Sequence, residues 1–121
     1  MLRSLSIALC LGLATPAGAF VAQNGLTVSA VGAQAFHVPW RGQSGTPAFW
    51  CAAGDYALRE LRLPPTADIY RYDAPRRGSG EGITFGLDPA RAQQTGLLRL
   101  FGGRGVSIAS ARTLCDGIGV R

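Results

Sequence analysis

The chain has 121 residues, with twelve arginines and no lysine against seven acidic residues, and its formal net charge is +5. This length suits one compact domain and excludes two domains of ordinary size. No apolar run approaches the roughly 20 residues that a membrane-spanning helix needs. We therefore expect no transmembrane segment in the mature chain.

The N-terminal segment has the layout of a secretory signal peptide. Arg3 supplies a positive charge, residues 7–13 are apolar, and the small residues Ala17 and Ala19 follow a proline. A charged start, a short apolar run and a small-residue cleavage site are typical of such leaders. We expect cleavage after Ala19, so that residues 1–19 are absent from the mature protein.

Cleavage after Ala19 leaves residues 20–121 as a single domain in the periplasm or outside the cell. A lipoprotein would instead keep Cys10 as its first residue. The preceding Ala8 and Leu9 lack the small residue that this processing prefers, and the apolar run would be cut short. Nucleic acid is not an expected partner of a protein exported in this way.

The first part of the domain has the pattern of strands. Apolar and polar residues alternate over residues 26–30 and again over residues 36–40. This period of two indicates half-buried β-strands. Gly32 lies between the two segments, and glycine inside a strand pattern predicts a bend or a bulge.

The stretch TPAFWCAAGDYALREL predicts the main helix. Thr46 is a suitable N-cap and Pro47 a suitable first helical residue, while Pro64 cannot continue a helix, so we expect a helix over residues 47–62. Cys51 falls on the apolar stripe of this helix. Asp55 falls on the opposite face, where we expect an exposed ion pair with Arg59.

The remaining residues predict a sheet. Residues 67–72 and 83–87 form a hairpin with a long tip, and residues 88–94 form a short helix begun by Asp88 and followed by Gly96. Residues 97–101 and 106–111 flank GGRG as a second hairpin. The fold class is therefore α+β: a small antiparallel sheet of four to five strands, with the helix at about 47–62 packed on one face.

The mature chain keeps two cysteines, Cys51 and Cys115. An even number of cysteines in an exported protein indicates a disulfide, here tying the helix to the C-terminal end. The alternative is a reactive Cys51 thiolate paired with His37, the single histidine. A thiolate prefers partial exposure and the first turn of a helix, and Cys51 lies deeper, on the apolar stripe.

Arginines and tyrosines gather around the first hairpin tip. Arg71, Arg76 and Arg77 stand near Tyr70 and Tyr72. Arginine binds carboxylates and phosphates well, so this tip is a candidate site for an anionic partner. The other interpretation is a solvated loop, because acidic residues are interleaved with the arginines and neutralise them locally.

Two tryptophans flank the predicted start of the main helix. Trp40 and Trp50 are candidates for lining a binding recess, although aromatic side chains of this size more often belong to a core. We predict no metal site and no cofactor. One histidine without a closely spaced second ligand is a poor basis for a metal site, and GSGEG at residues 78–82 leads into a strand instead of opening a helix.

Three segments together carry a resemblance to a protein family: FWCAAGDYALREL, ADIYRY and GITFGLDP. They are similar to small exported alphaproteobacterial proteins that share a Trp-Cys-x-Ala-Gly-Asp-aromatic stretch, a family with no known activity. The resemblance covers roughly the middle half of the chain. It implies a Gram-negative envelope location and brings no catalytic residue with it.

Two functional hypotheses follow from these observations. The first is a non-enzymatic exported module, held together by Cys51 and Cys115, that binds a protein or an anionic envelope component through the tip residues or the Trp40–Trp50 region. The second is a small envelope enzyme, a hydrolase or a thiol-dependent catalyst, that uses Cys51 with His37. No catalytic residue is assigned under the first hypothesis.

Overall fold

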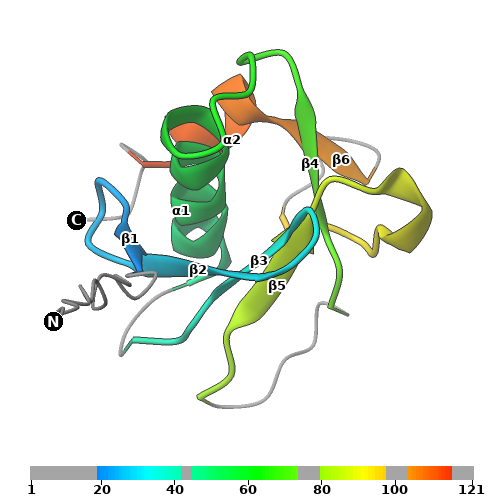
Figure 1. Ribbon diagram of the computed structural model, residues 1–121. Helices are drawn as coiled ribbons and strands as arrows, with labels where there is room; N and C mark the ends of the chain where they lie inside the picture. Colours follow the sequence, from blue (N-terminus) through cyan, green and yellow to red (C-terminus); the bar gives the residue numbers. More distant parts are fainter. Residues whose placement is uncertain (1–18, 42–44, 74–79, 98–103, 116–121) are drawn as a thin grey trace, which may run out of the picture.

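The computed structural model describes residues 19–41, 45–73, 80–97 and 104–115 (Figure 1). Six strands, two helices and one 3-10 turn follow one another along these residues. In chain order they are β1 (Phe20–Val21), β2 (Thr27–Gly32), β3 (Ala35–Val38), α1 (Thr46–Arg59), β4 (Asp68–Arg71), β5 (Ile83–Gly86), η1 (Pro89–Arg91), β6 (Gly105–Ser107) and α2 (Ile108–Thr113).

The strands form one antiparallel sheet in the order β1-β2-β3-β5-β4-β6. The predicted α+β class is confirmed, with six strands where four to five were expected. The first predicted hairpin is also confirmed, because β4 pairs with β5. The register of β2 against β3 shifts between Ala30 and Gly32, as the bend predicted at Gly32 requires.

Helix α1 covers one face of the sheet, and α2 packs against α1 (Figure 1). Alternate strand residues point toward α1: Phe36 and Val38 from β3, and Ile83 and Phe85 from β5, all fully or almost fully buried. The ring of Phe85 meets that of Trp50 edge to face at 4.8 Å between centroids. The hydrophobic core is therefore the layer between this helix and the sheet.

Helix α1 begins and ends slightly earlier than predicted. Its N-cap is Gly45, which makes no side-chain cap hydrogen bond, so the cap expected of Thr46 is not formed. The helix ends at Arg59, three residues before the predicted end. The N–H of Leu63 donates to the carbonyl of Ala57, and Arg62 takes a left-handed φ of 58°. This closing turn stops the helix before Pro64 is reached.

The C-terminal segment differs from its prediction. Residues 106–111 were expected to form one strand, but the strand ends at Ser107 and α2 follows directly. The Ser107 hydroxyl accepts from the N–H of Ser110 and so caps the helix. Strand β6 pairs with β4. The expected partner strand, residues 97–101, lies almost wholly outside the described residues.

Two smaller findings complete the fold. Asp88 caps the η1 turn, accepting from the N–H of Ala90 at 2.9 Å, which confirms the predicted start of the short helix; the helical turn itself is shorter than expected and ends at Arg91. Over the part of the chain that the structure describes, no helix has both the length and the apolar character to cross a membrane. The predicted signal peptide lies outside the described residues except for Ala19.

Candidate binding face

The two cysteines form the predicted disulfide. Cys51 of α1 is bonded to Cys115, which follows α2, across a sequence separation of 64 residues. The two helices approach closely here, since a Cβ placed on Gly54 would lie 2.8 Å from the Cβ of Ala111. The bond therefore joins two elements that already pack together.

The alternative pairing of Cys51 with His37 is not formed. The neighbours of His37 in β3, Phe36 and Val38, point toward α1, so His37 points to the opposite face of the sheet. Its Nδ1 atom shares a hydrogen bond of 2.9 Å with the hydroxyl of Thr84 on that face. Cys51 lies buried on the other side of the sheet, with its sulfur bonded to Cys115.

Two candidate binding residues are buried. Arg71 and Trp50 are both fully buried and both donate to the carbonyl of Thr95, at 3.1 and 3.0 Å. The segment around Thr95 crosses the end of β4, where the N–H of Gln93 also donates to the carbonyl of Arg71. The expectation that Arg71 and Trp50 present their side chains to a partner is therefore wrong. Sequence patterns could not show that this segment covers them.

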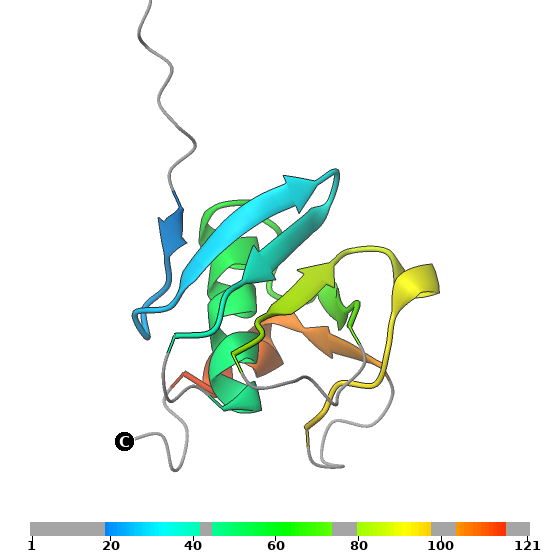
Figure 2. The same ribbon diagram turned by 90° about the horizontal axis from the view of Figure 1, so that it is seen from below.

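Among the described residues, no helix covers the other side of the sheet. Figure 2 views the strands from below, with α1 behind them. Alternation places a group of half-buried side chains near the middle of this face, away from α1. We call them the tyrosine face: His37, Tyr70, Tyr72 and Thr84.

Glycines on neighbouring strands make room for three of these side chains. A Cβ on Gly86 would clash with the ring of Tyr72, one on Gly105 would meet the ring of Tyr70 at 2.6 Å, and one on Gly82 would meet His37 at 2.8 Å. The two tyrosine rings therefore lie against the sheet instead of standing out from it.

Tyr72 is held on three sides. Besides the glycine beneath it, its hydroxyl accepts from the N–H of Asp88 at 2.9 Å, and the guanidinium of Arg91 lies 4.0 Å from its ring centroid. That arrangement is a cation–π contact. The ring of Tyr72 is therefore fixed before any partner arrives, which lowers the entropic cost of binding.

Two exposed arginines lie close to the tyrosines: Arg91 contacts the ring of Tyr72, and Arg104 directly precedes Gly105, the glycine under Tyr70. Arg104 also donates to the carbonyl of Ala92 at 2.9 Å. The sequence did not point to Arg91 as a binding residue, although cap chemistry predicted the short turn that contains it. Arg76 and Arg77, the other predicted tip residues, lie outside the described residues.

Trp40 is the exposed member of the predicted tryptophan pair. It follows β3 and keeps 43% of its surface exposed. Because Trp50 is buried in the core, the two rings do not line a common recess. Trp40 remains a candidate contact residue by itself.

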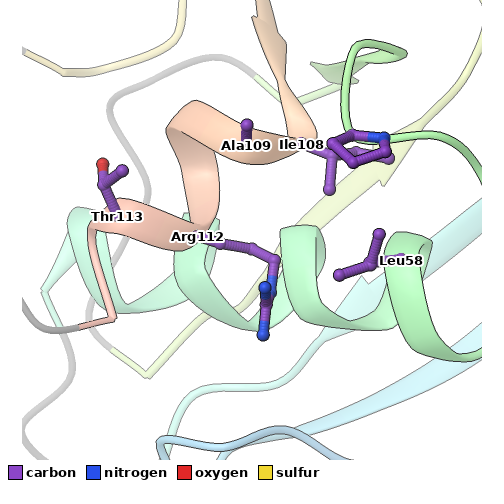
Figure 3. Close-up of a pocket in the computed structure, with 6 residues that line it drawn as sticks. Leu58, Ile108, Ala109, Arg112 and Thr113 are labelled. Atoms are coloured by element: carbon purple, nitrogen blue, oxygen red, sulfur yellow. The ribbon is translucent and has the colours of Figure 1, made fainter.

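A hollow lies between the two helices, away from the tyrosine face (Figure 3). It has a volume of about 300 Å³, and its walls are mainly apolar. Arg112, which Figure 3 shows reaching from α2 toward α1, is its charged lining residue. This guanidinium is already engaged, at 3.1 Å from the side-chain oxygen of Gln23 and 3.4 Å from Asp55. The hollow therefore offers packing surface but no free charged group.

The described residues contain no cluster of three or more histidine, cysteine or acidic side chains arranged to hold a metal ion.

Comparison with known proteins found no matching family model, no matching curated protein and no matching solved structure.

The glycine under Tyr72 gives a direct test of the tyrosine face. We expect Gly86→Ala to lower the free energy of unfolding by about 1–3 kcal/mol, because the new methyl group displaces the ring of Tyr72. The matched control is Gly32→Ala, where a Cβ meets nothing within 4 Å. Urea unfolding of both variants should show a clear loss for Gly86→Ala only. Equal stability of the two variants would mean that Tyr72 is not held against Gly86.

Proposed function

We propose that this chain is a non-enzymatic exported module, in the periplasm or outside the cell, that binds an anionic component of the envelope through its tyrosine face. One observation carries the proposal: the helices cover one side of the sheet, and among the described residues the other side presents Tyr70 and Tyr72, with Arg91 stacked on Tyr72 and Arg104 next to the glycine under Tyr70.

Charge favours an anionic partner. Without Arg3 of the leader, residues 20–121 keep eleven arginines against seven acidic residues, a net charge of +4, and Arg91 and Arg104 are both exposed. The carboxylates of Asp73 and Asp88 nearby keep their charge but are held in place, because they accept from the N–H groups of Thr84 and Ala90 at 2.7 and 2.9 Å. Guanidinium groups beside aromatic rings suit phosphate or carboxylate groups carried on a less polar body.

Cysteine chemistry favours a binding role over the thiol-dependent enzyme. The sulfur of Cys51 is bonded to Cys115, and His37 points to the other side of the sheet, where it bonds to Thr84. The disulfide, the leader-like N-terminus and the resemblance to exported alphaproteobacterial proteins support a location in a Gram-negative envelope.

Vesicle binding tests the proposal. We expect saturable binding to vesicles that contain phosphatidylglycerol, none to vesicles of phosphatidylcholine alone, and weaker binding as salt screens the charges. The double variant Arg91→Gln, Arg104→Gln should bind at least tenfold more weakly. Co-sedimentation at low and moderate ionic strength measures each affinity.

The matched control is Arg41→Gln, Arg62→Gln, which removes the same charge from two other exposed positions. We expect its affinity to fall no more than about twofold. An equal loss in the two double variants would show that binding follows net charge alone. The absence of binding to anionic vesicles and to purified lipopolysaccharide would refute the proposed partner class.

A further inference from the structure

Phe20 is the first described residue that packs against the hydrophobic core. Its ring packs edge to face on Tyr56, with 5.5 Å between centroids, and the guanidinium of Arg59 lies 5.0 Å from its centroid. Phe20 belongs to the rim of the hydrophobic core, whereas Ala19 is exposed. The bond between Ala19 and Phe20 therefore separates a residue that is packed from one that is not.

A hollow of about 360 Å³ opens beside this bond. Side chains from β1, β2 and the C-terminal end of α1 surround it. They are Phe20, Val28, Ser29, Ala30, Tyr56 and Glu60; Ala19, just before β1, also lines the hollow in the uncut chain and would leave with the leader.

Glu60 is the acidic residue of this hollow. Tyr56 and Glu60 line the same hollow, and burial and the negative charge of Glu60 both raise the pKa of Tyr56. Within the part of the chain that the structure describes, no cation forms an ion pair with Glu60. The neighbouring Arg59 is paired with Asp55 at 2.6 Å. The hollow thus has an uncompensated carboxylate next to the start of β1.

We infer that this hollow receives the α-ammonium group of Phe20 after the Ala19–Phe20 bond has been cut, with Glu60 as its counter-charge. Hydrolysis by a leader peptidase adds one water molecule across the amide bond, leaving a carboxylate on Ala19 and an ammonium group on Phe20. Maturation then adds an ion pair that the uncut chain, with a neutral amide at this position, cannot form. The inference rests on the proposed export.

The charges around the hollow fit a single ammonium group. Arg59 contributes a cation over the ring of Phe20, but Asp55 compensates it. Tyr56 is neutral at physiological pH, as a phenol ordinarily is, and burial raises its pKa further. Ser29 from β2 is the remaining polar lining residue. The carboxylate of Glu60 is therefore the charge that the new ammonium group meets.

Titration of the processed protein tests this inference. The full chain is expressed with its own leader, purified from the periplasm, and its first residue identified by mass. We expect Phe20 as the first residue, with an α-amino pKa several tenths of a unit above the ordinary value of about 7.7–8.0. The pKa is read from the pH dependence of amine acylation.

Glu60→Gln should return the α-amino pKa to its ordinary range. Asp68→Asn, which removes an exposed acid at the opposite end of the sheet, should leave the pKa raised. Identical pKa values in Glu60→Gln and the unaltered protein would overturn the inference. A first residue other than Phe20 would also overturn the inference, but the proposed export would still stand. A protein that retains its leader would overturn both the inference and the proposed export.

Discussion

Replacing both cysteines, as Cys51→Ala with Cys115→Ser, should lower the free energy of unfolding by about 4 kcal/mol. The bond spans 64 residues, and in the chain-entropy model closing a loop of this size restricts the unfolded chain by about that amount. Domains of this kind have a total stability of about 5–15 kcal/mol. The variant should therefore be folded in buffer but unfold at a much lower urea concentration.

The double variant leaves no lone thiol, so its stability reports the bond alone. The unaltered protein unfolded with and without reductant provides the internal comparison, and both routes should give the same loss. The tyrosine face lies on the far side of the sheet from the bond, so vesicle affinity at low temperature should be unchanged. A loss below about 1 kcal/mol would show that the bond contributes little to the fold.

Asp55→Asn should lower the free energy of unfolding by about 3 kcal/mol, which is close to the effect of removing one partner of a buried ion pair. Asp55 is fully buried and connects three parts of the fold. It accepts from the N–H of Gln23 at 2.9 Å and from Arg59 at 2.6 Å, and it lies 3.4 Å from Arg112 of α2. Asparagine keeps the shape but removes the charge that holds both arginines.

Arg59→Gln is the control for this prediction. Arg59 keeps 49% of its side-chain surface exposed, and an exposed partner of an ion pair contributes about 1 kcal/mol or less. Urea unfolding at neutral pH should therefore separate the two variants by at least about 1 kcal/mol. If Asp55→Asn proved as mild as Arg59→Gln, the carboxylate would not be the junction that the structure indicates.

Local sequence chemistry was sufficient to predict the main elements. Proline and turn residues delimit α1 to within three residues, and alternating residues mark β2 through β5. The disulfide followed from the number of cysteines and the leader-like N-terminus, without any knowledge of distance. Each of these predictions depends on neighbouring residues in the sequence or on a simple count. Distant segments of the chain do not alter such features, and the structure therefore confirms the predictions.

Burial that depends on distant segments was not predictable. Asp55 was expected on an exposed helix face, but the Gln23 loop and Arg112 of α2 cover it. Arg71 was expected at an exposed tip, but the segment around Thr95 lies over it. The covering residues are between 24 and 57 positions away in the chain, too far for periodicity to reveal them.

The tyrosine face was partly visible in the sequence. Tyr70 and Tyr72 were selected together with Arg71, yet a period of two places the tyrosines on one face of β4 and Arg71 on the other. Applying the alternation strictly would have separated them. The contribution of Arg91 and Arg104 depends on how η1 and β6 fold back beside β4, which no local pattern shows.

The central claim is that the protein is an exported domain locked by one disulfide. The most direct test measures the intact mass of the protein, purified from its own cells after free thiols have been blocked by alkylation. We predict the mass of a chain that begins at Phe20, two hydrogens short of the dithiol form, with no alkylated cysteine and with the two hydrogens restored by reductant. A chain that retains residues 1–19, or that carries an alkyl group on Cys51 or Cys115, would contradict the account.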